Sequence, residues 1–195
     1  MNIKHYILAS LTLFSLASCS EKDDTPEEYP DWKNQNENFF EQAYLSNGYD
    51  FKIPKYSLVG ESSSNHTDYV LVKVFEEGEG GETPYLSDSI AVHYVGYLMP
   101  STTYSEGYQF DKSYLDPFDW ATAVPSIMAV NDTRIGFATA LMKMHRGDHW
   151  LIIIPYQLGY GAYDAGSSGQ IPAYSTLMFE VRLEDFWTKK KGDRD

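Results

Sequence analysis

Short runs of alternating apolar and polar residues fill most of this chain after Asp68, and they constrain its fold more than any other feature. Such alternation is typical of strands that bury one face. One amphipathic helix lies among the runs, and Gly147-Asp148 ends it. Because crossover helices are largely missing, we expect an α+β domain in which a curled antiparallel β-sheet, a half-barrel, wraps around one short α-helix. The predicted strands are 69–75, 89–98, 149–154 and 176–186, and the helix places Phe137, Ala140, Leu141 and Met144 on one face.

A second helix is predicted ahead of the strands, in an N-terminal extension and linker that we assign to residues 30–67. Asp31 can cap its start, and Ser46-Asn47-Gly48 ends it. Its apolar face must be buried, and we favour packing on the main domain over a dimer contact or an arm that holds another polypeptide. The residues of this face are Trp32, Phe39, Phe40, Ala43 and Tyr44.

The first 18 residues have the pattern of a secretory signal. Lys4 precedes an apolar stretch from Ile7 to Leu16, which is shorter than the about 20 residues that span a bilayer. Leu16-Ala17-Ser18-Cys19 is similar to the lipobox of bacterial lipoproteins, which implies cleavage before Cys19 and its acylation. A plain signal with an incidental cysteine is the alternative, but Cys19 is the only cysteine of the chain. Its acylation would leave no thiol for a disulfide or a metal.

Residues 19–29 would then form a lipidated tether, because they are charged and interrupted by proline. Ser20-Glu21-Lys22-Asp23-Asp24 is similar to the acidic export tags of some Bacteroidetes lipoproteins, and an ordinary linker explains it equally well. The resemblance implies a bacterial, Bacteroidetes-like lipoprotein. We expect it in the outer membrane, held by lipid at Cys19 and facing the periplasm or the cell surface.

The charge of the chain argues against nucleic acid as a partner. The formal net charge is −13, and it becomes −14 without residues 1–18, in which Lys4 is the one charged residue. The tail 188–195 is also charged. His145 and His149 have the spacing of metal ligands on a helix, but the helix-ending Gly147-Asp148 separates them. We therefore expect solvent-facing imidazoles, no metal and no cofactor.

Four short aromatic fragments follow one another along the chain. They are Val92-His93-Tyr94-Val95-Gly96, Gln109-Phe110-Asp111-Lys112-Ser113, Leu158-Gly159-Tyr160-Gly161-Ala162 and Ile171-Pro172-Ala173-Tyr174-Ser175-Thr176-Leu177-Met178-Phe179. Each fragment alone is a weak signal, since aromatic residues are common on strands, but their ordered co-occurrence is specific. Their order and spacing resemble those of an FKBP-type peptidyl-prolyl cis-trans isomerase, and the resemblance covers about residues 68–187.

The resemblance implies an aromatic hollow between sheet and helix that receives a prolyl ring. It implies that the Tyr160 hydroxyl and a backbone N–H near Arg134 hold substrate carbonyls, and that Asp111 orders the polar side of the hollow. Asp111 as a purely structural carboxylate is an equal alternative. The implied catalytic residues are Tyr94, Phe110, Asp111, Phe137, Tyr160 and Phe179, and the implied substrate-binding residues are Phe118, Arg134, Ile135 and Ile171.

The chemistry explains why such residues suit this reaction. Rotation about an X-Pro bond faces a barrier of roughly 18–20 kcal/mol. A planar amide is stabilised by charge separation, which the twisted transition state loses. An apolar hollow therefore favours the twisted form, and each tenfold gain in rate needs about 1.4 kcal/mol of this preference.

The chain also departs from the family pattern. Many members have Val-Ile-x-Gly-Trp ahead of the helix, whereas this chain has Thr133-Arg134-Ile135-Gly136-Phe137. The apolar wall is thinner and the floor is a smaller ring. The loop between Ser113 and Pro117 is short and offers no arginine to pair with Asp111, which leaves the role of Asp111 and tight binding of macrolide inhibitors open.

Two functions therefore remain. The first is isomerisation of X-Pro bonds in unfolded or exported polypeptides, and we favour it. The second is a proline-peptide-binding chaperone or adaptor that keeps the fold with little or no turnover. The altered segment 133–137 and the extra helix motivate the second hypothesis.

Overall fold

The computed structural model describes residues 29–58, 60, 62–116, 118–119, 122–166 and 169–188. The predicted signal peptide, Cys19, all of the tether except Tyr29, and nearly all of the charged tail lie outside these residues.

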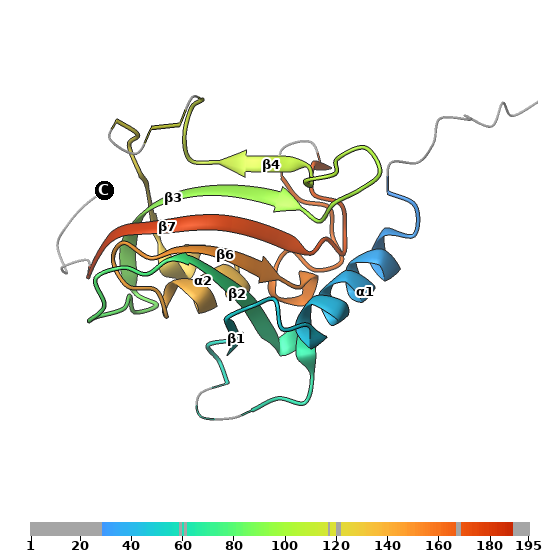
Figure 1. Ribbon diagram of the computed structural model, residues 1–195, viewed down its shortest axis with the longest axis horizontal. Coiled ribbons are helices and arrows are strands. Elements are labelled where there is room, and N and C mark those ends of the chain that lie inside the picture. The colour runs from blue at the N-terminus through green and yellow to red at the C-terminus, as the bar shows by residue number, and fades with distance from the viewer. Residues whose placement is uncertain are drawn as a thin grey trace, which may run out of the picture.

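One seven-stranded sheet organises the molecule, and every strand pair in it is antiparallel. The strand order is β1-β2-β6-β7-β3-β4, with β5 beside β3 as well (Figure 1). The expected α+β half-barrel is therefore confirmed. The strands are β1 (Phe51–Pro54), β2 (Tyr69–Glu76), β3 (Asp88–Leu98), β4 (Gln109–Lys112), β5 (Ser126–Ala129), β6 (His149–Ile154) and β7 (Leu177–Thr188), and short 3-10 turns lie at His66–Asp68, Val130–Asp132 and Tyr156–Leu158.

The helix α2 (Ile135–Leu141) packs against the concave face of the sheet. Gly136 allows this close approach, because a Cβ there would lie 2.3 Å from Cγ2 of Ile154 on β6. The helix is shorter than predicted. It ends at Leu141, and the chain continues in tight turns that still bury Met144 completely. The main hydrophobic core lies between this helix and the concave face.

The helix α1 (Trp32–Leu45) covers part of the opposite, convex face. Phe40 is 2% exposed and packs with Leu71 of β2 and Ile153 of β6. The Trp32 indole N–H donates to the Ser175 hydroxyl at 2.9 Å, which ties the helix to the chain just before β7. The domain itself therefore covers the apolar face, as we favoured over a dimer contact or an open arm.

The start of α1 differs from the prediction. Asp31 occupies the position before the helix, but its backbone is left-handed and its side chain caps no helical N–H group. Instead, its carboxylate accepts a hydrogen bond from the Asn34 side chain at 2.6 Å. No helix in the described part of the chain is long and apolar enough to cross a bilayer.

Candidate active site

Three aromatic rings from three different elements meet at the N-terminal end of α2. Tyr94 lies on β3, Phe179 on β7 and Phe137 on α2. The ring centroids of Phe137 and Phe179 are 4.9 Å apart, and Tyr94 lies 6.1 Å from Phe179 and 6.3 Å from Phe137. All three pairs are edge-to-face, which is a favourable geometry for aromatic rings. The rings form the floor and one wall of a hollow.

A fourth ring supports this wall, and a glycine leaves the space for it. Phe110 of β4 packs edge-on against Phe179 at 5.5 Å. Gly96 of β3 lies beneath both rings, and a Cβ there would come within 2.6 Å of Phe110 and 2.8 Å of Phe179. The glycine of the His-Tyr-x-Gly fragment is thus required by the packing of the rings.

The polar side of the hollow is a bonded pair. The Tyr94 hydroxyl donates to Oδ2 of Asp111 at 2.9 Å, and Oδ1 of Asp111 accepts the Lys112 backbone N–H at 2.8 Å. Burial, followed by the bond to Asp111, raises the pKa of Tyr94. The phenol is therefore protonated at neutral pH, and it fixes the carboxylate as an acceptor.

The mouth of the hollow carries a stacked cation. The guanidinium of Arg134, at the start of α2, lies 5.0 Å from the centroid of the Tyr160 ring. Tyr160 follows the 3-10 turn Tyr156–Leu158, and the next residue, Gly161, adopts a φ of 72° that suits glycine. This cation–π contact holds Arg134 beside the hollow, where the sequence had indicated only a backbone N–H.

These groups enclose a hollow of about 190 Å³. It brings together six of the residues singled out from the sequence, namely Tyr94, Asp111, Arg134, Phe137, Tyr160 and Phe179. The sequence reasoning did not assign a role to three further lining residues. Asp132 and Thr133 directly precede Arg134, and Met128 lies on the short strand β5, whose alternation is too brief to detect.

Four other predicted residues lie outside the lining. Phe118 does not line the hollow as predicted. It packs against His93, which precedes Tyr94 on β3 and therefore points to the opposite, convex face. Ile171 is 2% exposed and belongs to the core, where its backbone pairs with Ala165. Ile135 is exposed at the start of α2. Phe110 borders the hollow only from behind Phe179.

His145 and His149, which have metal-ligand spacing in the sequence, lie beside different carboxylates. Across the described ranges, no three His, Cys, Asp or Glu side chains come together as ligands. His149 is largely buried and lies 2.8 Å from the Glu180 carboxylate, so the expectation of a solvent-facing imidazole was wrong for this residue. His145 is more open, with its Nδ1 at 3.4 Å from Asp148.

The profile of FKBP-type peptidyl-prolyl cis-trans isomerases matches residues 80–184, which is more than half of the chain. The chain belongs to this family.

Two curated relatives illustrate the similarity. The chain is 34% identical over 115 residues to the macrophage infectivity potentiator of Trypanosoma cruzi, covering 59% of this chain and 52% of that protein. It is 38% identical over 111 residues to the FKBP-type 22 kDa peptidyl-prolyl cis-trans isomerase of Escherichia coli, covering 57% and 47%. The chain thus spans about half the length of these relatives.

Solved structures show the same fold. A peptidyl-prolyl cis-trans isomerase from Pseudomonas syringae pv. tomato aligns with a TM-score of 0.57 at 22% identity, over 83% of this chain and 98% of that one. FkpA from Escherichia coli aligns with a TM-score of 0.56 at 26% identity, over 81% and 60%.

Proposed function

We propose that this protein accelerates cis-trans rotation of X-Pro bonds in unfolded or exported polypeptides. The observation that carries the proposal is the hollow of about 190 Å³ walled by Tyr94, Phe137 and Phe179, in a chain of the FKBP-type family. Its size and apolar rings suit a prolyl side chain. The family resemblance supports the assignment of the reaction.

The mechanism needs no nucleophile and no proton transfer. A prolyl ring seated in the hollow, against the Phe137 and Phe179 rings, would leave the water that stabilises the planar, charge-separated amide most. The twisted imide loses less stabilisation than the planar form when water is excluded, so the barrier to rotation falls. Asp111 is held by the Tyr94 hydroxyl and serves as a fixed acceptor on the polar side of the hollow.

Substrate carbonyls need donors at the mouth. Tyr160 lines this edge of the hollow, and its hydroxyl is the first donor in our proposal. The backbone N–H groups at the start of a helix have no partner within the helix. Since no side chain caps α2 at Arg134, the backbone there is the second donor in our proposal.

A protease-coupled assay with a proline tetrapeptide tests the activity. We expect acceleration by the wild type and a loss of about tenfold in kcat/KM for Tyr160→Phe, because one hydrogen bond to the substrate disappears. Tyr160→Phe combined with Phe179→Ala should abolish acceleration. Tyr163→Phe, on an exposed ring of the same loop, is the matched control. A wild type without acceleration would refute the proposal.

The second candidate is a binding module with little turnover. Arg134 favours it, because a charged side chain stands at the mouth of an otherwise apolar hollow. In that case, proline peptides would quench or shift pocket fluorescence on binding while the isomerisation rate stayed at its uncatalysed value.

We further propose that Cys19 carries the lipid that anchors the protein in the outer membrane. The support is the Leu16-Ala17-Ser18-Cys19 fragment and the acidic residues after it. Cys19→Ser should move the protein from the membrane fraction to the soluble fraction of lysed cells and abolish palmitate labelling. Unchanged labelling would contradict the proposal.

A further inference from the structure

A second hollow lies on the concave side of the sheet, and it is larger than the aromatic one. Its volume is about 640 Å³, and its lining includes all of β1 together with Val74 and Trp150 from the neighbouring strands. The opposite wall comes from the β2–β3 connection and from Lys143 and His145, just after α2. The two hollows therefore flank the two ends of α2.

The floor of this groove, which we call the β1 groove, is apolar. Phe51 is 49% exposed, although it contacts the Trp150 ring at 6.1 Å between centroids. Ile53 and Trp150 are buried beneath it. An aromatic side chain that is half exposed above a buried apolar floor is a ready contact for another apolar side chain.

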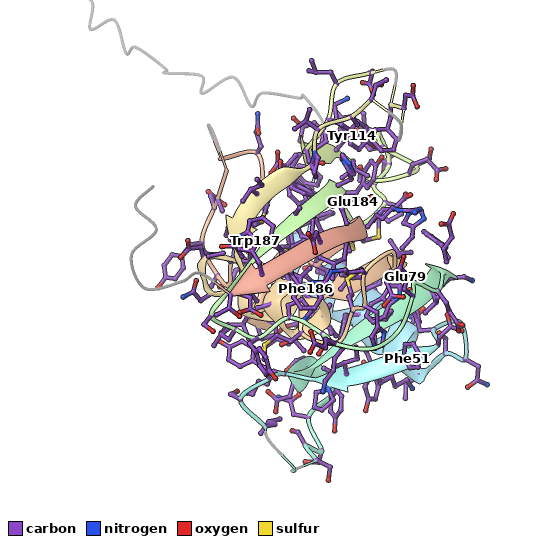
Figure 2. The ribbon with its side chains drawn as sticks, turned by 90° about the vertical axis from the view of Figure 1, so that its left-hand side faces the viewer. Phe51, Glu79, Tyr114, Glu184, Phe186 and Trp187 are labelled. Carbon is purple, nitrogen blue, oxygen red and sulfur yellow. The ribbon has the colours of Figure 1, made fainter. Side chains whose placement is uncertain are left out.

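The far wall is rigid. Asp148 is buried, and its carboxylate accepts the backbone N–H groups of Gly78 and His145, each at 2.6 Å. The Glu79 N–H donates to the Arg146 carbonyl at 2.9 Å. A Cβ on Gly78 would lie 2.1 Å from that carbonyl oxygen, so the two segments fit tightly. Figure 2 shows Phe51 of β1 and Glu79 of the β2–β3 connection on the same side of the molecule.

The backbone of β1 identifies the class of ligand. β1 is the terminal strand of the sheet, and among the described strands only β2 pairs with it. An open strand edge presents backbone donors and acceptors that only another extended polypeptide matches in register. The four residues of β1 span about 13 Å, and its last residue, Pro54, offers a carbonyl but no N–H.

The charges at the rim agree with this class. Lys143 lines the groove together with Asp50 and Glu77, so both signs of charge are present. Asp50 already accepts the Val74 N–H at 2.8 Å, whereas the Lys52 ammonium lies on the opposite face of the sheet, 4.4 Å from the centroid of the Tyr44 ring of α1. A mixed rim of this kind complements a polypeptide of apolar residues with little net charge, and it does not complement a phosphate polymer or an anionic lipid surface.

We infer that the β1 groove binds an extended apolar segment of the same unfolded polypeptide whose prolyl residue enters the aromatic hollow. This inference rests on the proposed function. α2 has seven residues and is about 10 Å long, so a few extended residues of one client chain can bridge the two sites. Joining two weak sites in this way raises the apparent affinity for long clients and leaves short ones unaffected.

Phe51→Ser tests the inference with two substrates. We expect unchanged kcat/KM on a proline tetrapeptide, which fills only the aromatic hollow, and a fall of about tenfold in kcat/KM on the proline-limited refolding of an unfolded protein. Phe75→Ser is the matched control, because Phe75 lies on β2 with 46% exposure but packs on His149 on the other face. Equal rates of Phe51→Ser and wild type on the refolding protein would overturn the inference.

A direct binding measurement separates this inference from the isomerase proposal. The probe is a labelled, proline-free peptide of alternating Phe, Val and Ser residues, followed by fluorescence anisotropy. We expect wild type and Tyr160→Phe to bind it alike, Phe51→Ser to bind about tenfold more weakly, and N-methylation of alternate peptide bonds to abolish binding. Binding that ignores N-methylation would overturn strand addition. A concentration-dependent dimer that Phe51→Ser dissolves would show a second copy as the occupant and also overturn the inference.

Discussion

Gly96 is the position in the aromatic hollow with the least space for a side chain. Its Cα lies under the Phe110 and Phe179 rings, and a Cβ would approach both to less than 3 Å. The Phe179 ring cannot move aside easily, because the Tyr94, Phe110 and Phe137 rings pack around it. A methyl group here must therefore displace the wall of the hollow.

We expect Gly96→Ala to lower kcat/KM by about tenfold and the free energy of unfolding by about 1–3 kcal/mol, as overpacking does in other cores. The assays are tetrapeptide isomerisation and urea unfolding. Gly48→Ala is the control, since a Cβ there meets only the Ser46 hydroxyl at an ordinary 3.5 Å. Wild-type activity in Gly96→Ala would mean that the rings move freely.

We expect His93, on the convex face behind Tyr94, to make the stability of the protein depend on pH. Burial is the main cause that lowers the pKa of His93, and Arg182 adds to it while Glu184 opposes it. The unfolded chain therefore binds a proton more readily than the folded one. The stability is complete above about pH 6.5 and falls as the pH drops below that value.

Urea unfolding at several pH values between 4.5 and 7.5 should show this decline, and His93→Gln should flatten it. Hydrogen bonds from Lys55 and Arg146 lower the pKa values of Asp68 and Asp185. These two carboxylates therefore lose their contribution to stability only as the pH falls below the ordinary pKa of an aspartate. The pH range in which His93 affects stability is thus separate from that of the two aspartates. An equal slope in wild type and His93→Gln would contradict the assignment.

At the scale of elements, α1 is an integral part of the domain. Its Phe40 fills a small convex-side core with Leu71 and Ile153, and its Asn36 side chain accepts the Thr176 N–H at 2.6 Å. The Glu37 carboxylate accepts the Tyr156 hydroxyl at 2.9 Å. The helix therefore supports the segments that lead into Tyr160 and into β7.

Phe40→Ala should lower the free energy of unfolding by about 3–5 kcal/mol, because a fully buried ring leaves a cavity. The measurement is urea unfolding followed by far-UV circular dichroism. Leu45→Ala, in the same helix but 71% exposed, should change it by less than about 0.5 kcal/mol. Equal effects of the two substitutions would show that α1 does not pack as described.

Periodicity predicted the long elements well and the short ones poorly. The predicted strand 149–154 coincides with β6, and the strands around β2, β3 and β7 differ by one or two residues. β1 and β5 have four residues each, too few for alternation to stand out. Helical spacing overextended α2 to Met144, because a tight turn can also bury that side chain.

The same limits apply to the hollow. The family resemblance placed Tyr94, Asp111, Phe137, Tyr160 and Phe179 around one hollow, and the structure brings them together there, while their catalytic roles stay predictions. The face that Phe118 occupies depends on the course of the loop after β4, which no local pattern encodes. The position of Arg134 over Tyr160 is likewise set by tertiary structure. Met128 could not be assigned to the hollow from the sequence, because the short strand β5 that carries it was not predicted.

At the scale of the whole molecule, β7 is the central strand. It pairs along its length with β3 on one side and, over Leu177–Arg182, with β6 on the other, and its Phe179 forms part of the hollow. A chain that ends at residue 176 keeps every other element but leaves β3 and β6 without a common neighbour.

We expect such a truncated chain to show no cooperative urea transition and no isomerase activity, because both the sheet and its core lose their middle. Circular dichroism and limited proteolysis provide the measurement. The chain ending at residue 188, which retains β7, is the control. A cooperative transition in the shorter chain would show that the other elements fold stably without β7.

The late position of this central strand also affects biosynthesis. Contacts between strands that lie so far apart along the chain form slowly and only when both partners are present. A ribosome-bound nascent chain therefore cannot close its sheet until residues 177–188 have emerged. The nascent polypeptide therefore keeps its aromatic hollow incomplete until the strand that carries Phe179 has been made.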